Sequence, residues 1–591
     1  MTPLDYLVTA GAIGLLLCAG FWFSRRGGKN LTAFILGNRS LPWWLGGSAM
    51  VAGSSNVDSP LHQSGKVQRD GLPGAWFYWS GSLSQSFASV VFSRLWRRTG
   101  LNTVVEFYDL RYARPGGAIV RIWSALYATF VEGTLQLALG LLAMLKIWAV
   151  LVGPLDPVGL AGFLVPAELL LLTGAVILAL GYSTAAGLLG VVAGDLLEFL
   201  FAIVGSYVLM FAVYRAVGGP AGLEQGLAGL GRGAALDFTP AVGISLVAFF
   251  VFQTIGQACG TNNTNQRFLA IRDEREAMFS GVWRLVNHFF FRTWPWYVCG
   301  LAALVLFAGR GIGREDSYPM LIREYLPSGW RGLLFAGFAV SFMSSVGSLM
   351  HSSGAVFVND LYRPFLVRQR TDRHYVWASR AAMIAFATVA VVIAFSADHI
   401  LGLLQFFMKL VGAVGTIWLA RWFWWRVNSW ADLAAQIGAV PVALFYQFGP
   451  GRGWVSGLAG LAGPPSPDDF FGADYIFSVG TTALLWLLVM RLTPPEPMEK
   501  LCEFYRRVRP YGWWGPVARL CPEVRVTDRI SRDLGLSLGL LGIALSLLFG
   551  AGCVFLARWL GAVLWLTLGA LLAGWLVRAI GRMERPQSPP G

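Results

Sequence analysis

The sequence predicts an all-α polytopic membrane protein, and two observations carry that prediction. Of the 591 residues, 55% are hydrophobic and 13% are charged, whereas a soluble domain carries about 25% charged residues. Apolar runs of roughly 17–25 residues, which is the length that crosses a bilayer as a helix, recur from one end of the chain to the other. These runs lack the alternation of polar and apolar residues that a transmembrane β-barrel requires.

We predict fifteen membrane spans, and the first of them is a retained helix. Asp5 precedes it, and Arg25 and Arg26 follow it, which reverses the charge order of a cleaved signal peptide. The predicted spans are residues 6–24, 43–67, 74–92, 122–151, 166–182, 188–213, 239–259, 286–307, 333–358, 381–395, 401–422, 430–445, 475–490, 534–556 and 560–576.

The basic residues indicate the orientation of the chain and do not indicate a nucleic-acid partner. The net charge is +14, but the Lys and Arg residues are concentrated in short segments between apolar runs, which is the pattern of membrane topology. With the N-terminus outside, most of the 46 Lys and Arg residues fall in cytoplasmic segments. We therefore expect a multi-pass protein of the plasma (inner) membrane whose partner is the lipid bilayer, with residues 491–533 and the C-terminus in the cytoplasm.

Two predicted spans contain residues that do not suit a continuous lipid-facing helix. The ten central spans divide into two sets of five, and each set opens with such a span. The first contains Gly-Ser-Ser-Asn-Val-Asp-Ser-Pro at 53–60, and the sixth contains Gly-Gln-Ala-Cys-Gly-Thr-Asn-Asn at 256–263. Interrupted helices at corresponding places in two halves indicate a transporter site near the membrane midplane. Close helix packing would explain the Gly and Ser residues, but not Asn56, Asp58 and Pro60 together.

Several motifs, in this order and spacing, resemble the sodium:solute symporter family, which includes sodium–glucose and sodium–proline cotransporters. The resemblance extends over about residues 36–435. The motifs are GNRSLPWW at 37–44, TVVEFYDLRY at 103–112, GLLGVVAGDLLEF at 187–199, QRFLA at 266–270, and SSVGS at 344–348 with DLY at 360–362.

The resemblance implies the fold of the leucine transporter, in which two five-helix repeats are inverted relative to each other. We expect an extra N-terminal helix at residues 1–28 and a ten-helix core at 36–426. Two accessory helices would follow at 427–490. The cytoplasmic segment 491–533 could be a small helical insertion or a linker, and two further helices with a short tail would occupy 534–591.

A sodium ion is a hard cation that prefers about five or six oxygen ligands, and hydroxyls and backbone carbonyls supply them at low desolvation cost. The resemblance assigns the two hydroxyl ligands to Ser344 and Ser345 and a carbonyl ligand to Ser341. It assigns the carbonyl ligands of the first core helix to Ala52 and Ser55, with a shift of one or two residues left open. The alternative for the two hydroxyls is hydrogen bonding to the preceding helical turn.

The family also uses an acidic position near a further sodium site, and Asp195 matches it with Ser348 as a possible partner. The alternative is a carboxylate at a helix end that pairs with a nearby Arg. Either way we expect a paired charge, because an isolated charge within a span is costly.

The solute site is less clearly defined by the sequence. Asp58 and Glu132 are carboxylates within predicted spans, which makes them candidates for a functional site. They could equally pair with Lys146 or Arg292, which lie in other spans. The candidates for solute binding are Asp58, His62, Gln63, Glu132, Gln253, Gln257 and Gln405.

These features together predict a secondary active transporter that couples inward sodium flux to symport of a small polar organic solute. The solute could be a sugar, an amino acid, a nucleoside or a carboxylate. A solute sensor or receptor on the same fold and a proton-coupled symporter are the alternatives. We expect no enzyme activity, because the sequence shows no metal-ligand cluster, nucleophile–base pattern or phosphate loop. No cofactor beyond the coupling ion is expected, and the oligomeric state stays open.

Overall fold

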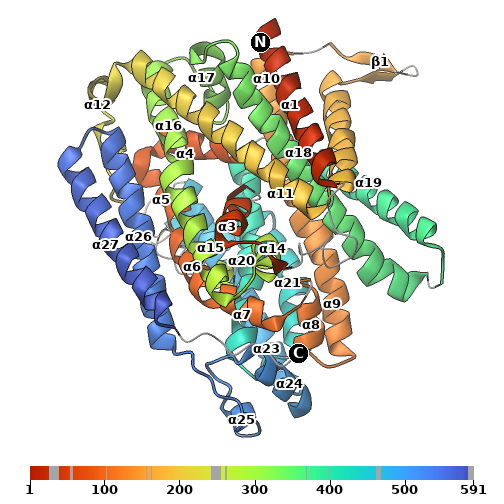
Figure 1. Cartoon of the computed structure of the whole chain (residues 1–591). Helices are drawn as coiled ribbons and strands as arrows, with labels where there is room; N and C mark the ends of the chain where they lie inside the picture. Colours follow the sequence, from red (N-terminus) through yellow and green to blue (C-terminus); the bar gives the residue numbers. More distant parts are fainter. Residues whose placement is uncertain are drawn as a thin grey trace.

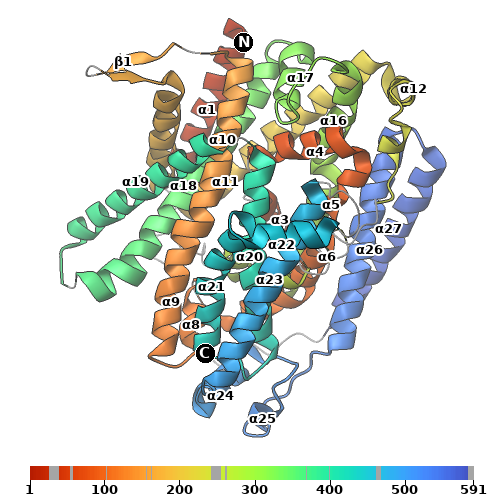
Figure 2. The same cartoon turned by 180° about the vertical axis from the view of Figure 1, so that it is seen from behind.

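The computed structural model describes residues 1–24, 39–52, 57–101, 103–154, 156–160, 163–240, 246, 250, 254–259, 262–367, 369–397, 399–460 and 467–583. The molecule is a bundle of long helices (Figures 1 and 2). The antiparallel hairpin of β1 (Val158–Leu160) and β2 (Phe163–Val165) projects from the end of the bundle that holds the N-terminus (Figure 1).

The helices of the chain follow one another with few long connections. The first half forms α1 (Pro3–Ser24), α3 (Trp43–Ala52), α4 (Asp58–Gly74), α5 (Trp76–Trp79), α6 (Gly81–Phe87), η2 (Ala88–Phe92), α7 (Ser93–Thr99), α8 (Glu106–Arg111), α9 (Gly116–Leu126), η3 (Tyr127–Gly133), α10 (Thr134–Leu151), α11 (Ala167–Val217), α12 (Gly219–Gly229) and η4 (Gly233–Leu236). The second half forms α14 (Asn262–Ala270), α15 (Glu274–Val286), η5 (Asn287–Arg292), α16 (Trp294–Leu306), α17 (Ser317–Tyr325), α18 (Trp330–Val356), η6 (Phe357–Leu366), α19 (Asp372–Ser396), α20 (Ile400–Phe423), α21 (Ser429–Gln447), α22 (Gly451–Gly460), α23 (Pro467–Leu492), α24 (Met498–Val508), α25 (Gly515–Ala518), α26 (Ile530–Phe555) and α27 (Trp559–Gly581).

Eight helices in the described part of the chain are long and apolar enough to cross a membrane, and α1 and the start of α11 are shorter apolar helices. The predicted spans at 166–182 and 188–213 both lie in α11, and the residues between them are helical. Figure 1 shows the first and last parts of α11 running in different directions. Most of the predicted span at 239–259 lies outside the described residues. The polytopic helical fold is therefore confirmed, whereas the count of fifteen spans stays a prediction.

Large apolar side chains on the outer helices are exposed. On α27, Leu560 is 76% exposed and Leu571 is 68% exposed, and on α23 Leu484 is 70% exposed. A soluble monomer rarely exposes so continuous an apolar surface. In a bilayer the same side chains face lipid, so their exposure fits a membrane-embedded bundle.

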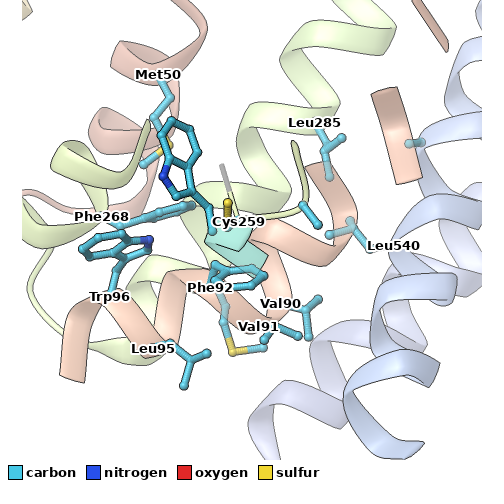
Figure 3. Close-up of a cluster of buried hydrophobic side chains, with 14 of the residues drawn as sticks. Met50, Val90, Val91, Phe92, Leu95, Trp96, Cys259, Phe268, Leu285 and Leu540 are labelled. Carbon is cyan, nitrogen blue, oxygen red and sulfur yellow. The ribbon is translucent and has the colours of Figure 1, made fainter. Parts of the chain in front are cut away.

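The interior joins helices that are distant in sequence. Figure 3 shows one cluster of buried side chains that includes Met50 from α3, Phe92 from η2, Trp96 from α7 and Leu540 from α26. Phe268 and Leu285 come from α14 and α15 in the same cluster. Helix α26, the second to last helix of the chain, is thus part of the main core.

Residues 491–533 form a helical insertion that packs against the bundle. Phe504 of α24 lies 5.8 Å, between ring centroids, from Phe107 of α8 and 5.4 Å from Trp514. Glu496 accepts hydrogen bonds from the backbone amides of Ala113 and Ser429 and from the hydroxyl of Ser429. The connection after α23 therefore holds the α8–α9 turn against the start of α21.

A group of charges joins this segment to α7, and we call it the Arg94 cluster: Arg94, Asp528 and Asp533, which are buried, and Arg98, Glu274 and Arg532, which are partly exposed. Arg94 donates to Asp528 at 2.8 Å and to Asp533 at 2.5 Å. Arg98 donates to Asp528 at 2.6 Å and to Glu274 at 2.9 Å. The cluster ties the end of α7 to the starts of α15 and α26.

Candidate functional site

The structure describes the residues on both sides of the predicted interruption in the first core helix, but not residues 53–56 within it. Helix α3 ends at Ala52 and helix α4 begins at Asp58. The residues between them, including Ser55, lie outside the described part of the chain. The carbonyl of Ala52 belongs to the last turn of α3, where carbonyl groups lack partners within their own helix. The carbonyl ligands predicted at Ala52 and Ser55 therefore stay predictions.

The serine residues predicted to bind sodium share one face of α18. Ser341, Ser344 and Ser345 are separated by three and four residues, a spacing that brings side chains together on a helix. Ser341 and Ser344 are buried, and Ser345 is half-buried.

A small cavity joins this face of α18 to the divided helix. It has a volume of about 10 Å³ and is lined by Ser345, by Val57 directly before α4, and by Gln136 and Gly140 of α10, among others. That volume is about what one water-sized particle requires. The structure therefore brings one of the predicted hydroxyl ligands to the helix interruption across a space of ionic size.

Asp195 and Ser348, the candidates for a second sodium site, lie on α11 and α18, which pack along each other. The two helices approach closely, since a Cβ on Gly337 would lie 3.2 Å from the backbone nitrogen of Ala202. The side chains of Asp195 and Ser348 lie outside the described part, so their pairing stays a prediction.

The polar residues of α4 form a buried group with Tyr78 of α5. His62 Nε2 lies 3.6 Å from Asp58 Oδ2, and His62 Nδ1 lies 2.8 Å from the hydroxyl of Tyr78. Asp58, His62 and Gln63 are each 95% buried or more. Within the described residues, Asp58 Oδ1 and Gln63 Oε1 have no hydrogen-bond partner. An unsatisfied buried acceptor is costly, so these two oxygens are suited to receive donors from a bound molecule.

Two charged residues complete the surroundings of α4. Arg292 at the end of η5 is buried against the ring of Trp296, 4.9 Å from its centroid. It interacts electrostatically with Asp58 and with Glu198 of α11. Lys146, the other predicted partner, instead lies 3.2 Å from Glu315. Of the two alternatives, only Arg292 therefore lies close enough to balance Asp58.

The remaining candidates lie on helices near the same site. Glu132 is buried in η3. Gln257 is half-buried in a helical turn whose Gly256 packs on α20, where a Cβ on Gly256 would lie 2.8 Å from the backbone of Gly412. Gln405 is half-buried on α20, which also contacts α4. Gln253 lies outside the described residues.

Sequence reasoning missed two residues of this site, Tyr78 and Glu198. Tyr78 stands in an aromatic run, Trp-Phe-Tyr-Trp, that reads as an interface anchor. Glu198 stands in a predicted span, where a carboxylate is itself a sign of function. The position of Glu198 within a predicted span could therefore have identified it from the sequence.

Comparison with known proteins agrees with this architecture. The model of the sodium:solute symporter family matches residues 34–438. The chain is 24% identical to the sodium/glucose cotransporter of Vibrio parahaemolyticus, over 76% of this chain and 86% of the relative. It is 22% identical to sodium/glucose cotransporter 1 of Oryctolagus cuniculus, over 70% of this chain and 67% of the relative.

A short stretch and a solved structure extend the comparison. Over 20% of this chain and 26% of the relative, the chain is 31% identical to the high-affinity proline transporter PutP of Bacillus subtilis (strain 168). A Na⁺-coupled sialic acid symporter, solved in a substrate-bound outward-open state, superposes with a TM-score of 0.64 at 17% identity, over 84% of this chain and 99% of that one. This likeness shows the fold. Since the family model covers more than half of the sequence, the chain belongs to the sodium:solute symporter family.

Proposed function

We propose that the protein couples the entry of sodium to the inward symport of a small polar organic solute by alternating access. The observation that carries this proposal is the small cavity between Ser345 of α18 and Val57, the residue directly before α4. Family membership supports the same activity.

In this proposal the sodium ion binds where Ser345 of α18 faces Val57, directly before α4. The hydroxyls of Ser344 and Ser345 and the carbonyls of Ala52, Ser55 and Ser341 supply its ligands. Sodium binding stabilises the conformation in which the two helices are held together. Solute affinity rises in that conformation because coupling between two sites is reciprocal. Asp195 and Ser348 are proposed as a second sodium site.

The solute binds beside α4, where Asp58 and Gln63 each present a buried acceptor oxygen. A solute with hydroxyl or amine groups would donate hydrogen bonds to these oxygens. Such a requirement favours a sugar, an amino acid or a nucleoside over a solute without donors. His62, Glu132, Gln253, Gln257 and Gln405 are proposed as further solute contacts.

We propose that the N-terminus is outside the cell and that residues 491–533 and the C-terminus are cytoplasmic, in the plasma membrane. The positions of the basic residues support this orientation. Arg94 and Arg98 of the Arg94 cluster would then lie at the cytoplasmic surface.

The test is sodium-dependent uptake by the double variant Ser344→Ala/Ser345→Ala in proteoliposomes. Two of about five ligands are lost, so the sodium concentration for half-maximal uptake should rise at least about tenfold. Sodium should also cease to raise the melting temperature, because a ligand stabilises only the state that binds it. Helix α18 should persist, since Ala has the higher helix propensity.

The matched control is Ser537→Ala/Ser546→Ala on α26, which removes two buried hydroxyls from another core helix. Ser537 donates to the carbonyl of Asp533 at 2.8 Å, the kind of bond that the alternative explanation assigns to the α18 serines. If the curves of uptake against sodium concentration overlap for the wild type, the control and the α18 variant, the sodium site does not lie on α18.

Proton coupling is the alternative function, and one group of contacts favours it. His62 lies between Asp58 and Tyr78, so three groups that can bind a proton are in contact. A proton gradient imposed without sodium should drive no accumulation if sodium is the coupling ion. Accumulation under that gradient, abolished by His62→Gln, would establish the alternative instead.

A further inference from the structure

Helix α18, which carries the serines of the proposed sodium site, begins without a local side chain that could cap it. Its N-cap residue is Gly329, and the third residue of its first turn is Gly332. In a capping box, Ser or Thr at the first position and Glu or Gln at the second bond the backbone amides of these two residues. Two glycines supply neither bond, so both amides need acceptors from another part of the chain.

Asp5, in the first turn of α1, supplies both acceptors. Its Oδ1 accepts from the backbone amide of Gly329 at 2.7 Å and from that of Gly332 at 3.2 Å. Its Oδ2 accepts from the backbone amide and the hydroxyl of Thr2, at 2.8 Å and 2.9 Å. Asp5 is fully buried. The starts of two helices therefore meet at one carboxylate, and the partial positive charges of both N-termini favour its negative charge.

The backbones of α1 and α18 also touch at this place. A Cβ on Gly332 would overlap the backbone of Asp5, so only glycine permits so close an approach. The hydroxyl of Thr9 donates to the carbonyls of Asp5 at 2.8 Å and of Gly332 at 3.0 Å. These contacts fix the separation of the two helices and their position along each other.

The contact between α1 and α18 continues toward the sodium site (Figure 1). Leu16 of α1 is buried against Val340, the residue directly before Ser341. Nine residues separate Gly332 from Ser341, which is about 14 Å along a helix. Because α18 is one continuous helix over this stretch, a shift at its first turn also moves its serines relative to Val57 on the other side of the cavity.

We propose that Asp5 is a positioning residue for sodium, which caps α18 from α1 and thereby fixes Ser344 and Ser345 at the ion. The inference rests on the sodium site proposed above, and it gives the additional N-terminal helix α1 a role in ion affinity. A binding site works only when its ligands are held within about 0.5 Å of the productive geometry. An α18 helix without its cap should therefore bind sodium less tightly.

The test is the sodium dependence of the melting temperature, which can be measured before the solute is identified. Asp5→Leu removes the cap, and the sodium concentration for half-maximal stabilisation should rise about fivefold. Asp5→Asn keeps an acceptor oxygen on a preferred capping residue, so most of the affinity should remain. Gly332→Ala keeps Asp5 but separates the two backbones, and it should act as Asp5→Leu does. Thr9→Val removes a single hydroxyl, with an expected rise of about twofold, and serves if the other variants do not fold.

Asp273→Leu is the corresponding change at another helix, because Asp273 caps α15 through a 2.8 Å bond from the backbone amide of Glu276. This control should lower the melting temperature and leave the sodium response unchanged. If Asp5→Leu and Gly332→Ala also lose stability with the sodium midpoint of the wild type, the cap is only structural and the proposal is wrong. A wild type that sodium does not stabilise would contradict the sodium site itself, so the two failures are distinguishable.

Discussion

Two of the regions of this protein that hold buried polar groups differ in their hydrogen bonding. In the Arg94 cluster, each carboxylate oxygen of Asp528 and Asp533 accepts from an arginine. Beside α4, Asp58 Oδ1 and Gln63 Oε1 have no partner among the described residues. Native proteins satisfy nearly all buried polar groups. We infer that the satisfied cluster is structural and that the unsatisfied group is kept for a ligand.

The strongest test of this comparison is Arg94→Leu. The variant leaves two buried carboxylates without their main cation, which should lower the free energy of unfolding by about 3–5 kcal/mol. Thermal unfolding in detergent measures the loss. Arg506→Ala is the control, because the side chains of Arg506 and Glu523 form an ion pair in which each is 55% exposed. This variant should unfold as the wild type does. A stable, fully active Arg94→Leu protein would contradict the structural role.

Asp58→Asn should lower solute affinity and leave stability nearly unchanged. The volume of the side chain is kept and Oδ1 has no partner to lose in the described residues, so the melting temperature should change little. Solute affinity should fall about tenfold, since a hydrogen bond to a charged group contributes roughly 1.5–3 kcal/mol. Uptake kinetics and thermal unfolding on the same preparation separate the two effects. A large loss of stability with unchanged uptake would make Asp58 a structural partner of Arg292.

The smallest expected effect is the pH dependence of the Arg94 cluster. Burial raises the pKa of Asp528, but attraction from Arg94 and Arg98 outweighs burial and lowers the pKa below its ordinary value of 3.8. A lowered folded-state pKa contributes stability above the unfolded-state pKa, and this stability is lost as the pH falls through the folded-state value. The unfolding free energy should therefore decline below about pH 4. In the Asp528→Asn variant the unfolding free energy should decline less steeply between pH 5 and 3. An unchanged slope would show that Asp528 does not contribute to the decline.

Local sequence patterns predicted the features that depend on neighbouring residues. The motif at 53–60 predicts an interruption because Asn56, Asp58 and Pro60 suit no continuous lipid-facing helix; residues 58–60 open helix α4, and the state of residues 53–56 stays a prediction. The Ser344–Ser345 pair came from a motif. Contacts between distant residues were not predictable in the same way. The bond between His62 and Tyr78, the packing of Phe504 on Phe107, and the partners of Arg94 depend on how helices meet in space. Ser55 and Gln253 lie outside the described residues, and their roles stay predictions.

The separation within the Arg94 cluster affects how the protein is made. Arg94 and its partner Asp528 are 434 residues apart in the chain. At about 5–20 residues per second, a ribosome needs on the order of 20–90 s to synthesise the intervening chain. In the orientation proposed above, Arg94 acts during that interval as a positive charge that keeps its end of the span on the cytoplasmic side. In that orientation the same guanidinium serves first as a signal for membrane insertion and, once α26 has been synthesised, as the partner of Asp528 and Asp533 in the folded protein.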